Sequence, residues 1–360
     1  MKSIKENFQK AHIVIIGSGI IGKFNALELS ELGFQITIID PNEKKNSSNA
    51  ALGLLMGNMY QKRRGRSWDL RKQSIELWPK WIEFLQKINY ELNIQKPLIQ
   101  LTTNEEKFKK LEKFVYENND LNFKILKRDS ILIKNINQVF QTKNIKGMIS
   151  IEDGRINATS LLKTLDKYLK NKKINFINEE IIKIRKSNNQ WFSTTKNNRD
   201  IESDIVILCN SLKAVDLIDN LTHKIKLKPV LGQAIEVGIN DAEVDLLTLP
   251  KQFSINGKNI IPVSKNKLII GSSDEYSTKP EKNIFEKITN FLEEKPTWLI
   301  NGQVTKKWYG IRSRPEGEPS PIMKNLEDGL IICTGFYKNG ILLAPACSKW
   351  VANEIKNYFC

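Results

Sequence analysis

Histidine and cysteine are scarce: the 360-residue chain has two histidines and four cysteines. Cys209, Cys333, Cys347 and Cys360 show no Cys-x-x-Cys spacing and no histidine pairing, so the sequence predicts no metal site. Two of these cysteines lie in apolar segments with the character of strands, where a reduced and buried thiol is expected. His12 opens an apolar strand and His223 lies in a polar turn, and both are expected to be structural or at the surface.

Long apolar runs are absent as well. No segment approaches the ~20 consecutive apolar residues that span a bilayer. The first eight residues lack the apolar core of a signal peptide. The composition, 40% hydrophobic and 8% aromatic, is that of a globular protein, and the length allows two domains. We therefore expect a cytoplasmic protein that does not enter a membrane. Its oligomeric state is not predicted.

Acidic residues are outnumbered, which leaves a formal net charge of +16. Such an excess is found in proteins that bind nucleic acids, but most of this charge is lysine spread singly along the chain, which favours an ordinary solvated surface. One cluster differs, because the run Lys62-Arg63-Arg64-Gly65-Arg66 concentrates arginine in an arginine-poor protein. We interpret this basic cluster either as surface charge or as a contact for an anionic substrate or tRNA.

The most informative pattern is formed by glycines near the start. An apolar segment at residues 12–16 predicts a buried parallel strand, and an amphipathic helix follows. Between them, the first glycine permits a tight turn, the second leaves room for a pyrophosphate, and the third lets the helix pack closely on the strand. The pattern therefore predicts a dinucleotide site at a helix N-terminus, formed by Gly17, Ser18, Gly19, Ile20, Ile21 and Gly22.

A second buried strand is predicted at residues 34–39. Asp40 stands at its carboxyl end and is followed by Pro41. An acidic side chain at this position accepts hydrogen bonds from the ribose hydroxyls of the adenosine half. Asp40 and Pro41 are therefore predicted to bind the cofactor.

Periodicity predicts most of the remaining elements. Residues 68–94 have helical spacing, and Pro79 should divide or kink that helix. A fully apolar strand at 205–209 ends at Asn210. Further helices are expected at 105–117, at 161–169 and from 281 to about 294. Further strands are expected at 174–177, 181–184, 191–195, 234–237, 259–263 and 267–270.

The C-terminal region contains a second turn into a helix. A strand at 306–311 leads to Arg312, and another at 330–333 leads to the glycine-flanked turn 335–340 and a helix at 341–356. The N-terminus of this helix can face a different anionic part of the same cofactor. Arg314 would share a strand face with Arg312, but Pro315 is expected to break the strand there, which favours Arg312 as the residue that points into a site.

Four segments resemble the D-amino-acid-oxidase-like family of FAD-dependent oxidoreductases, and most of all its glycine oxidase (ThiO-type) branch. They are residues 48–55, 228–233, 261–272, and Gly310-Ile311-Arg312 together with 335–345. The resemblance implies an α/β fold in which a Rossmann-like FAD-binding domain is interleaved with an α+β substrate domain built on a mainly antiparallel sheet. We expect the FAD-binding domain at 1–85, 145–222 and 305–360, and the substrate-binding domain at 86–144 and 223–304.

The resemblance also implies roles for individual residues. It implies non-covalent FAD and the oxidation of an amine next to a carboxylate. Arg312 falls on the family's carboxylate-binding arginine, so it is a catalytic and substrate-binding candidate, and Lys338 is the second catalytic candidate. The turn 335–340 falls where the family places a helix N-terminus against flavin N1. The remaining implied cofactor-binding residues are Ser48, Leu52, Gly53, Leu54, Asn210, Gly335, Lys338, Asn339, Gly340 and Ile341.

Some positions depart from the family pattern. Asn210 replaces a glycine, and asparagine tolerates a left-handed backbone. Phe336 stands where relatives often have histidine, and Lys338 replaces a second arginine with a point charge. Ile260 or Ile261 stands where an aromatic residue closes the pocket for small substrates. Glycine is therefore not predicted as the substrate.

The leading functional hypothesis is an FAD-dependent amino-acid or secondary-amine oxidase. In it, a hydride passes to flavin N5, the imine is hydrolysed, and oxygen reoxidises the flavin to give hydrogen peroxide. The alternatives are a flavoenzyme acting on a carboxymethylaminomethyl-modified tRNA base, a dehydrogenase that uses another electron acceptor, and an FAD-binding protein without activity. The basic cluster favours the tRNA alternative, but no RNA-binding motif accompanies it.

Overall fold

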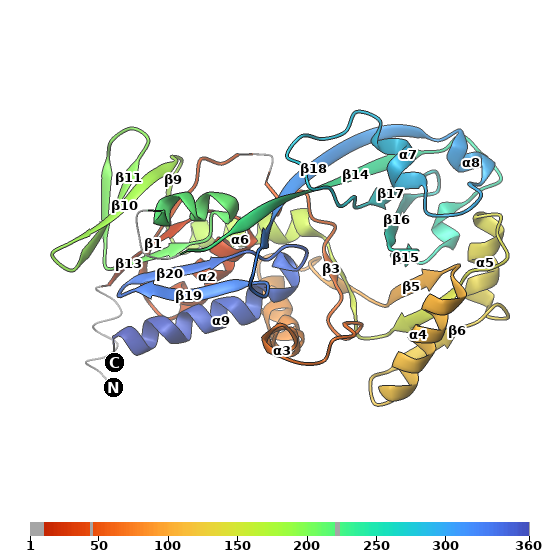
Figure 1. Ribbon diagram of the computed structural model, residues 1–360, viewed down its shortest axis with the longest axis horizontal. Helices are drawn as coiled ribbons and strands as arrows, with labels where there is room; N and C mark the ends of the chain where they lie inside the picture. The colour runs from red at the N-terminus through yellow and green to blue at the C-terminus, as the bar shows by residue number, and fades with distance from the viewer. Residues whose placement is uncertain (1–10, 44–45, 220–223, 360) are drawn as a thin grey trace.

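A computed structural model describes residues 11–43, 46–219 and 224–359 (Figure 1), so that His223 and Cys360 lie outside the described residues. Its central sheet has the strand order β19-β20-β13-β1-β2-β9. Strand β1 (His12–Ile16) pairs in parallel with β13 (Ile205–Leu208) and β2 (Gln35–Ile39). The outer strands are β9 (Asn175–Ile177), β20 (Leu330–Thr334) and the antiparallel edge β19 (Ile322–Glu327).

Both faces of the central sheet are covered, which explains why its strands are apolar without alternation. Ile13 and Ile15 pack against helices, whereas Val14 and Ile16 pack against a small antiparallel sheet. The helices are α2 (Ile20–Glu31), α3 (Arg66–Gln86), α6 (Ala158–Asn171) and α9 (Gly340–Tyr358). The small sheet consists of β10 (Ile181–Ser187), β11 (Gln190–Thr195) and β12 (Asp200–Ser203).

The other half of the molecule is built on a large sheet, at the right in Figure 1, with the order β18-β14-β17-β16-β15-β5-β7-β6. Its pairs are antiparallel except β15 with β5. The strands are β5 (Leu98–Thr102), β6 (Phe123–Leu126), β7 (Lys146–Ser150), β14 (Leu227–Gly238), β15 (Phe253–Ile255), β16 (Lys258–Ser264), β17 (Lys267–Gly271) and β18 (Gln303–Pro315). Helices α4 (Glu105–Glu117), α5 (Ile131–Val139), α7 (Ile284–Thr289) and α8 (Thr297–Ile300) cover it.

The chain alternates between the two halves: it leaves the central sheet after β2, returns with β9, leaves again with β14 and returns with β19. This arrangement confirms the predicted fold class, a Rossmann-like α/β part interleaved with a mainly antiparallel sheet. A short sheet of β3 (Leu54–Leu55), β8 (Gly154–Ile156) and β4 (Ile94–Gln95) lies where the two halves meet. The exact limits of the two domains stay a prediction. Among the described residues, no helix combines the length and apolarity needed to cross a bilayer.

Three predicted elements differ from the structure. Pro79 does not divide its helix, since α3 continues from Arg66 to Gln86, whereas the alternative, a kink at Pro79, stays a prediction. The Trp78 indole donates a 2.9 Å hydrogen bond to the Leu342 carbonyl, which fixes α3 on α9. The helix predicted from 281 to about 294 is formed only at Ile284–Thr289.

The third difference concerns the strand before Arg312. Strand β18 does not end there but runs to Pro315, which pairs with Leu227 of β14. Because β18 is the edge strand of the large sheet, a proline at its end removes no hydrogen bond that a central strand would need. The predicted break was therefore wrong, and Arg312 and Arg314 do lie on one face of the strand.

Candidate functional site

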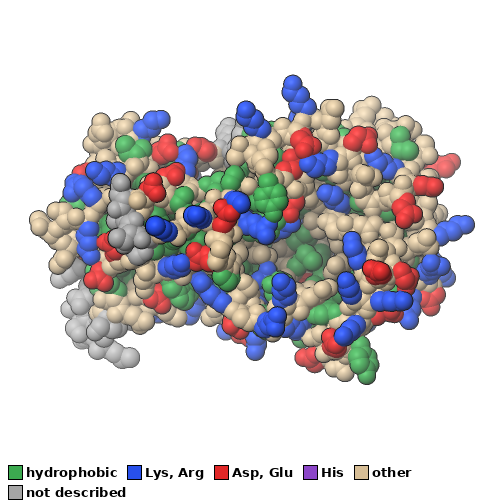
Figure 2. Space-filling view, in the orientation of Figure 1, with side chains coloured by type: hydrophobic (Ala, Val, Ile, Leu, Met, Phe, Trp, Pro, Cys, Tyr) green, Lys and Arg blue, Asp and Glu red, His purple; other side chains and the backbone are tan. Residues whose placement is uncertain are grey.

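A cavity of about 920 Å³ lies between the carboxyl ends of the central strands and the large sheet. Figure 2 shows lysine and arginine side chains around the central hollow of this face. Most predicted site residues line the cavity: Gly17, Gly19, Ile20, Ile21, Asp40, Pro41, Ser48, Leu52, Gly53, Leu54, Asn210, Arg312, Lys338, Asn339, Gly340 and Ile341. Ser18, Gly22 and Gly335 do not line it.

The glycine turn after β1 is shaped by two close backbone approaches. Gly17 has φ +106°, and a Cβ there would lie 2.8 Å from the backbone nitrogen of Asn210. A Cβ on Gly22 would lie 1.9 Å from the Gly17 carbonyl oxygen, so helix α2 rests directly on the turn. At Gly19 a Cβ would meet only the Ser48 hydroxyl, at 3.1 Å. Gly17 and Gly22 thus form the turn, and Gly19 leaves its cavity side open.

Two helix N-termini face the cavity. The N-cap residue of α2 is Gly19, which has no side chain to cap the helix. The N-cap residue of α9 is Asn339, and its side chain accepts no hydrogen bond from the first N–H groups of that helix. The Ile20 N–H donates to the Ser48 hydroxyl at 3.0 Å, whereas Gly340 and Ile341 bring the first turn of α9 to the cavity wall. The first N–H groups of a helix have no partner within the helix and carry its positive dipole end. Both ends can therefore bind negative charge.

The polar groups after β2 and β13 fit a dinucleotide. The Asp40 carboxylate accepts hydrogen bonds from the backbone N–H groups of Ser18 and Asn42, both at 2.7 Å, and still lines the cavity. The side-chain oxygen of Asn210 is buried and has no hydrogen-bond partner among the described residues. The backbone of Asn210 is not left-handed, with φ −85°; Ser211 takes that conformation instead, with φ +59°.

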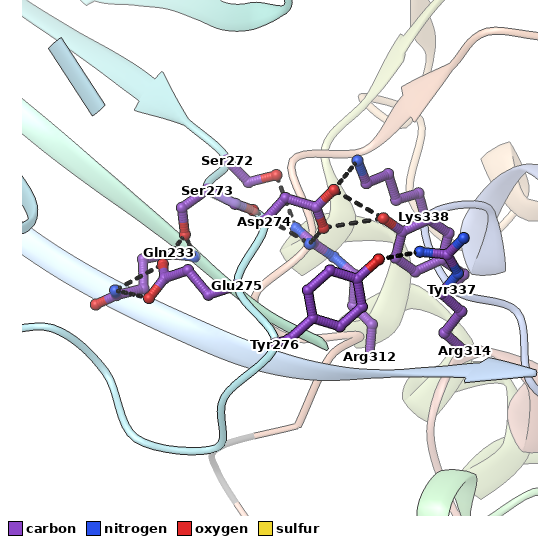
Figure 3. Close-up of polar contacts among 10 residues, drawn as sticks. All are labelled: Gln233, Ser272, Ser273, Asp274, Glu275, Tyr276, Arg312, Arg314, Tyr337 and Lys338. Atoms are coloured by element: carbon purple, nitrogen blue, oxygen red, sulfur yellow. Dashed lines mark hydrogen bonds and ion pairs between the residues drawn. The ribbon is translucent and has the colours of Figure 1, made fainter. Parts of the chain in front are cut away.

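At the large-sheet end of the cavity lies Arg312, whose side chain is 13% exposed. Its guanidinium lies against Gly232, where a Cβ would be 2.0 Å from Nη2. Nη2 donates to the Ser272 hydroxyl at 2.7 Å and Nη1 to the Ser273 carbonyl at 3.2 Å (Figure 3). Arg314 is exposed, donates to the Tyr276 hydroxyl and does not line the cavity. Of the two arginines, the structure places Arg312 in the cavity.

Sequence analysis missed Asp274, which lies in front of Arg312 (Figure 3). Its carboxylate accepts hydrogen bonds from Lys338 Nζ at 2.7 Å and from the Tyr337 hydroxyl at 2.7 and 2.9 Å, and lies 3.4 Å from Arg312 Nη1. Burial alone would raise the pKa of Asp274, but the contacts with Lys338, Tyr337 and Arg312 outweigh it and hold the pKa below 3.8. Burial and the Asp274 contact raise the pKa of Tyr337 to about 12.

The backbone around Asp274 is fixed from both sides. The Ser273 N–H donates to the Gln233 carbonyl at 2.9 Å, and Glu275 exchanges two backbone hydrogen bonds with Leu231, at 2.8 and 3.0 Å. The buried Glu275 carboxylate also accepts from the Gln233 amide at 3.0 Å and from the Ser273 hydroxyl. Asp274 is therefore carried by a rigid segment, and only its side chain can rotate. The sequence around it contains no motif that would have singled it out.

The basic cluster at residues 62–66 does not act as one surface. Lys62 is exposed at the cavity, and Arg64 is exposed away from it. Arg63 turns inward, donating to the Asn58 carbonyl at 2.7 Å, and Arg66 donates to the Met323 carbonyl at 3.3 Å. The cluster therefore contributes one charge, that of Lys62, to the cavity.

The loop that leads to this cluster is held by a buried carboxylate. Asp153 accepts hydrogen bonds from the backbone N–H groups of Gly57, Asn58 and Met59 at 2.8 to 2.9 Å. Burial raises the pKa of Asp153 despite these hydrogen bonds. The next residue, Tyr60, is an aromatic side chain on the cavity wall that sequence analysis missed. Ile260 and Ile261, expected there, are buried in the large sheet, and Asn259 lines the cavity instead.

Comparisons with known proteins agree over nearly the whole chain. The model of a family described as FAD dependent oxidoreductase (DAO) matches residues 12–354. The glycine oxidase of Pseudomonas aeruginosa is 22% identical over 351 residues, which cover 95% of this chain and 93% of the relative. The glycine oxidase of Geobacillus kaustophilus is 24% identical over 361 residues, which cover 96% of this chain and 92% of the relative.

Solved structures show the same fold. Glycine oxidase from Bacillus cereus superposes with a TM-score of 0.83 at 20% identity, covering 97% of this chain and 95% of that one. Iminodiacetate oxidase from Chelativorans sp. BNC1 superposes with a TM-score of 0.82 at 16% identity, covering 96% of this chain and 95% of that one.

Proposed function

The chain belongs to the DAO family of FAD-dependent oxidoreductases, and from this premise we propose that it oxidises an amino acid or a secondary amine that carries a carboxylate. FAD is the cofactor of the family, and the chain is an oxidoreductase. Two curated relatives that match along nearly the whole chain are glycine oxidases, which supports a small amine as the substrate. The observation that carries the proposal is the largely buried side chain of Arg312 in the same cavity as the N-terminus of α9.

We propose that the turn from Gly17 to Gly22 and the N-terminus of α2 hold the pyrophosphate of FAD. Asp40 receives the ribose hydroxyls, and the unpartnered oxygen of Asn210 is available to a further donor of the cofactor. The N-terminus of α9 would face the pyrimidine side of a bound flavin. A helix dipole of about half a charge there would stabilise negative charge on that side.

The substrate carboxylate binds to Arg312, whose planar fork matches it in two parallel hydrogen bonds. Lys338 adds a second positive charge, and Tyr337, protonated because its pKa is about 12, adds a hydrogen-bond donor. These contacts fix the angle at which the carbon next to the amine nitrogen faces the flavin. Bound FAD would supply the hydride acceptor for that carbon. Loss of the hydride and of a proton from the nitrogen would leave an imine, which water would hydrolyse. We further propose oxygen as the final electron acceptor.

The tRNA alternative receives no support from the cavity, since only Lys62 of the basic cluster lines it. The dehydrogenase alternative differs from an oxidase in the electron acceptor alone. A structural neighbour, L-proline dehydrogenase from P. horikoshii, is named for such an activity, with a TM-score of 0.77 at 18% identity. The yield of hydrogen peroxide distinguishes the two.

The test begins with the flavin absorbance of the purified protein. The oxidised holoenzyme is then mixed anaerobically with glycine, N-methylglycine, iminodiacetate, proline and D-amino acids. We expect at least one of them to bleach the flavin, and air to restore its colour with one peroxide per amine oxidised. A protein that binds FAD but is bleached by no carboxylate-bearing amine would overturn the proposal. Bleaching without peroxide would leave the dehydrogenase.

A further inference from the structure

The cavity wall contains a second buried arginine, Arg71 of helix α3. Arg71 is 6% exposed and lines the cavity together with Tyr60 and Gln100. Its guanidinium carbon lies 3.8 Å from the centroid of the Tyr60 ring, and its Nη1 donates to the Ser67 carbonyl at 3.0 Å. Its Nε is buried and has no hydrogen-bond partner among the described residues.

Among the described residues, no carboxylate balances this charge. None of the ion pairs formed in the described part of the chain includes Arg71. Among the described residues, the Tyr60 phenol is the one ionisable neighbour that influences the pKa of Arg71. Burial lowers the pKa of Arg71, but a guanidinium keeps its proton in proteins. Burying a charge is unfavourable unless a counter-ion or hydrogen bonds compensate for the lost water. The vacant donor positions of Arg71 therefore suit an anion that enters the cavity.

Arg63 shows what a purely structural arginine looks like in the same region. It also has a buried Nε without a partner, and its guanidinium lies over Trp68 and Phe114 at 4.7 and 5.3 Å. However, Asp120 and Asp153 place negative charge near it, and it does not line the cavity. The two arginines differ in two features: within the described part of the chain Arg71 has no acidic counter-charge, and it lines the cavity.

Arg71 also differs from Arg312. The charge of Arg312 is partly balanced by Asp274, at 3.4 Å, whereas Arg71 has no such partner in the residues described. The two guanidinium groups come from different elements, α3 and β18, and line one cavity. Lys62, exposed and in the same cavity, adds positive charge from the loop that carries Tyr60. A ligand whose single carboxylate binds Arg312 would leave Arg71 without a counter-ion in the described part of the chain.

We propose that Arg71 binds a second carboxylate of the substrate, so that the enzyme acts on acidic amines, that is, amino or imino dicarboxylates. The inference rests on the proposed amine oxidation and specifies its substrate class. The Tyr60 ring covers one face of the guanidinium, which leaves the N–H groups in its plane for a carboxylate. Arg312 holds the carboxylate next to the reacting carbon, and Arg71 holds the distant one.

The test compares isosteric substrates that differ in one charge, using the FAD-loaded full chain. Iminodiacetate and its monoamide are suitable, as are aspartate and asparagine. We expect wild-type kcat/KM to favour the diacid by at least about tenfold, or about 1.4 kcal/mol. Arg71→Gln should abolish this preference and lower kcat/KM for the diacid while that for the monoamide stays the same. The matched control Arg63→Gln should keep the preference.

A binding measurement separates this inference from the proposed function. Succinate and succinamate, which are not amines, are titrated into the oxidised holoenzyme by calorimetry. Tighter binding of succinate that is lost in Arg71→Gln supports the site even if no amine is oxidised. Amine oxidation without any preference for diacids would overturn the inference and leave the proposed function standing. Loss of FAD in Arg71→Gln would also overturn it, since Arg71 would then hold the cofactor. If Arg71→Gln does not fold, Arg71→Lys should reduce the preference without abolishing it, because it keeps the charge but lacks the fork.

Discussion

The carboxylate of Asp274 lies 2.7 Å from the ammonium nitrogen of Lys338, so an acidic side chain of the protein itself occupies part of the space in front of Arg312. Asp274 also accepts from the Tyr337 hydroxyl, and the positions at which a carboxylate can accept hydrogen bonds are nearly all in use. A substrate carboxylate must therefore share these donors with Asp274 or displace it. Because the backbone on both sides is fixed, displacement requires rotation of the side chain alone.

We expect Asp274→Asn to strengthen the binding of carboxylate ligands. The amide keeps the shape of the side chain but removes the competing charge. The exposed ion pair of Asp274 with Lys338 is of a kind worth up to about 1 kcal/mol, or about two- to fivefold in Kd. Titration of the holoenzyme with acetate or glycine, followed by the flavin spectrum, measures the change. Weaker binding in the variant would show that Asp274 supports the site instead of competing for it.

The lowered pKa of Asp274 predicts that the stability difference between wild type and this variant depends on pH. The pKa of Asp274 is lower in the folded protein than its ordinary value of 3.8, so its contribution to stability is complete above that value and is lost as the pH falls through the folded pKa. We expect the difference in Tm between wild type and Asp274→Asn to be constant from about pH 6 to about pH 9 and to shrink below about pH 4. A difference that changes near neutral pH would point to another titrating group.

Arg312→Lys should reduce kcat/KM about 10- to 100-fold, or about 1.4–2.8 kcal/mol, because lysine keeps the charge but loses the fork. Arg312→Ala should cost more, with the FAD content unchanged. The matched control is Arg314→Ala, which removes an arginine from the same strand face outside the cavity. Full activity in Arg312→Ala together with loss in Arg314→Ala would reverse the assignment.

Gly232→Ala should impair the substrate site without unfolding the protein. The new methyl group would lie 2.0 Å from Arg312 Nη2, the free end of a flexible side chain, so the guanidinium moves while the backbone does not. We expect kcat/KM to fall about tenfold or more, as geometry is lost at the carboxylate. Thermal unfolding and FAD content should match those of wild type; a large fall in Tm would instead mean that the strand pair is disturbed.

Gly19→Val should prevent FAD binding, because its side chain would project into the proposed pyrophosphate site. Asp40→Ala should weaken FAD by about 1.5–3 kcal/mol, the value of a hydrogen bond to a charged group. The dissociation constant of FAD for each variant is measured from the quenching of FAD fluorescence when FAD is titrated with the apoprotein. Unchanged FAD affinity in Gly19→Val would place the cofactor elsewhere.

The sequence alone determined the dinucleotide part of this protein. The strand, the glycines, the helix and Asp40 are contiguous in the chain, and Gly22 is required by a local approach to the Gly17 carbonyl. Patterns of this kind are local, so they can be predicted before the fold is known. The C-terminal turn before α9 and the position of Arg312 were predicted in the same way, from contiguous residues that resemble a family.

Only the tertiary structure decided what surrounds Arg312 and which other charges reach the cavity. Asp274 is 38 residues from Arg312 and 64 from Lys338, so their contacts depend on how β14, β17 and β18 pair. Arg71 lies in an ordinary amphipathic helix, and the absence of a counter-ion for it among the described residues is a property of the packed cavity. Charge balance and burial arise from groups distant in the chain, and no local pattern encodes them.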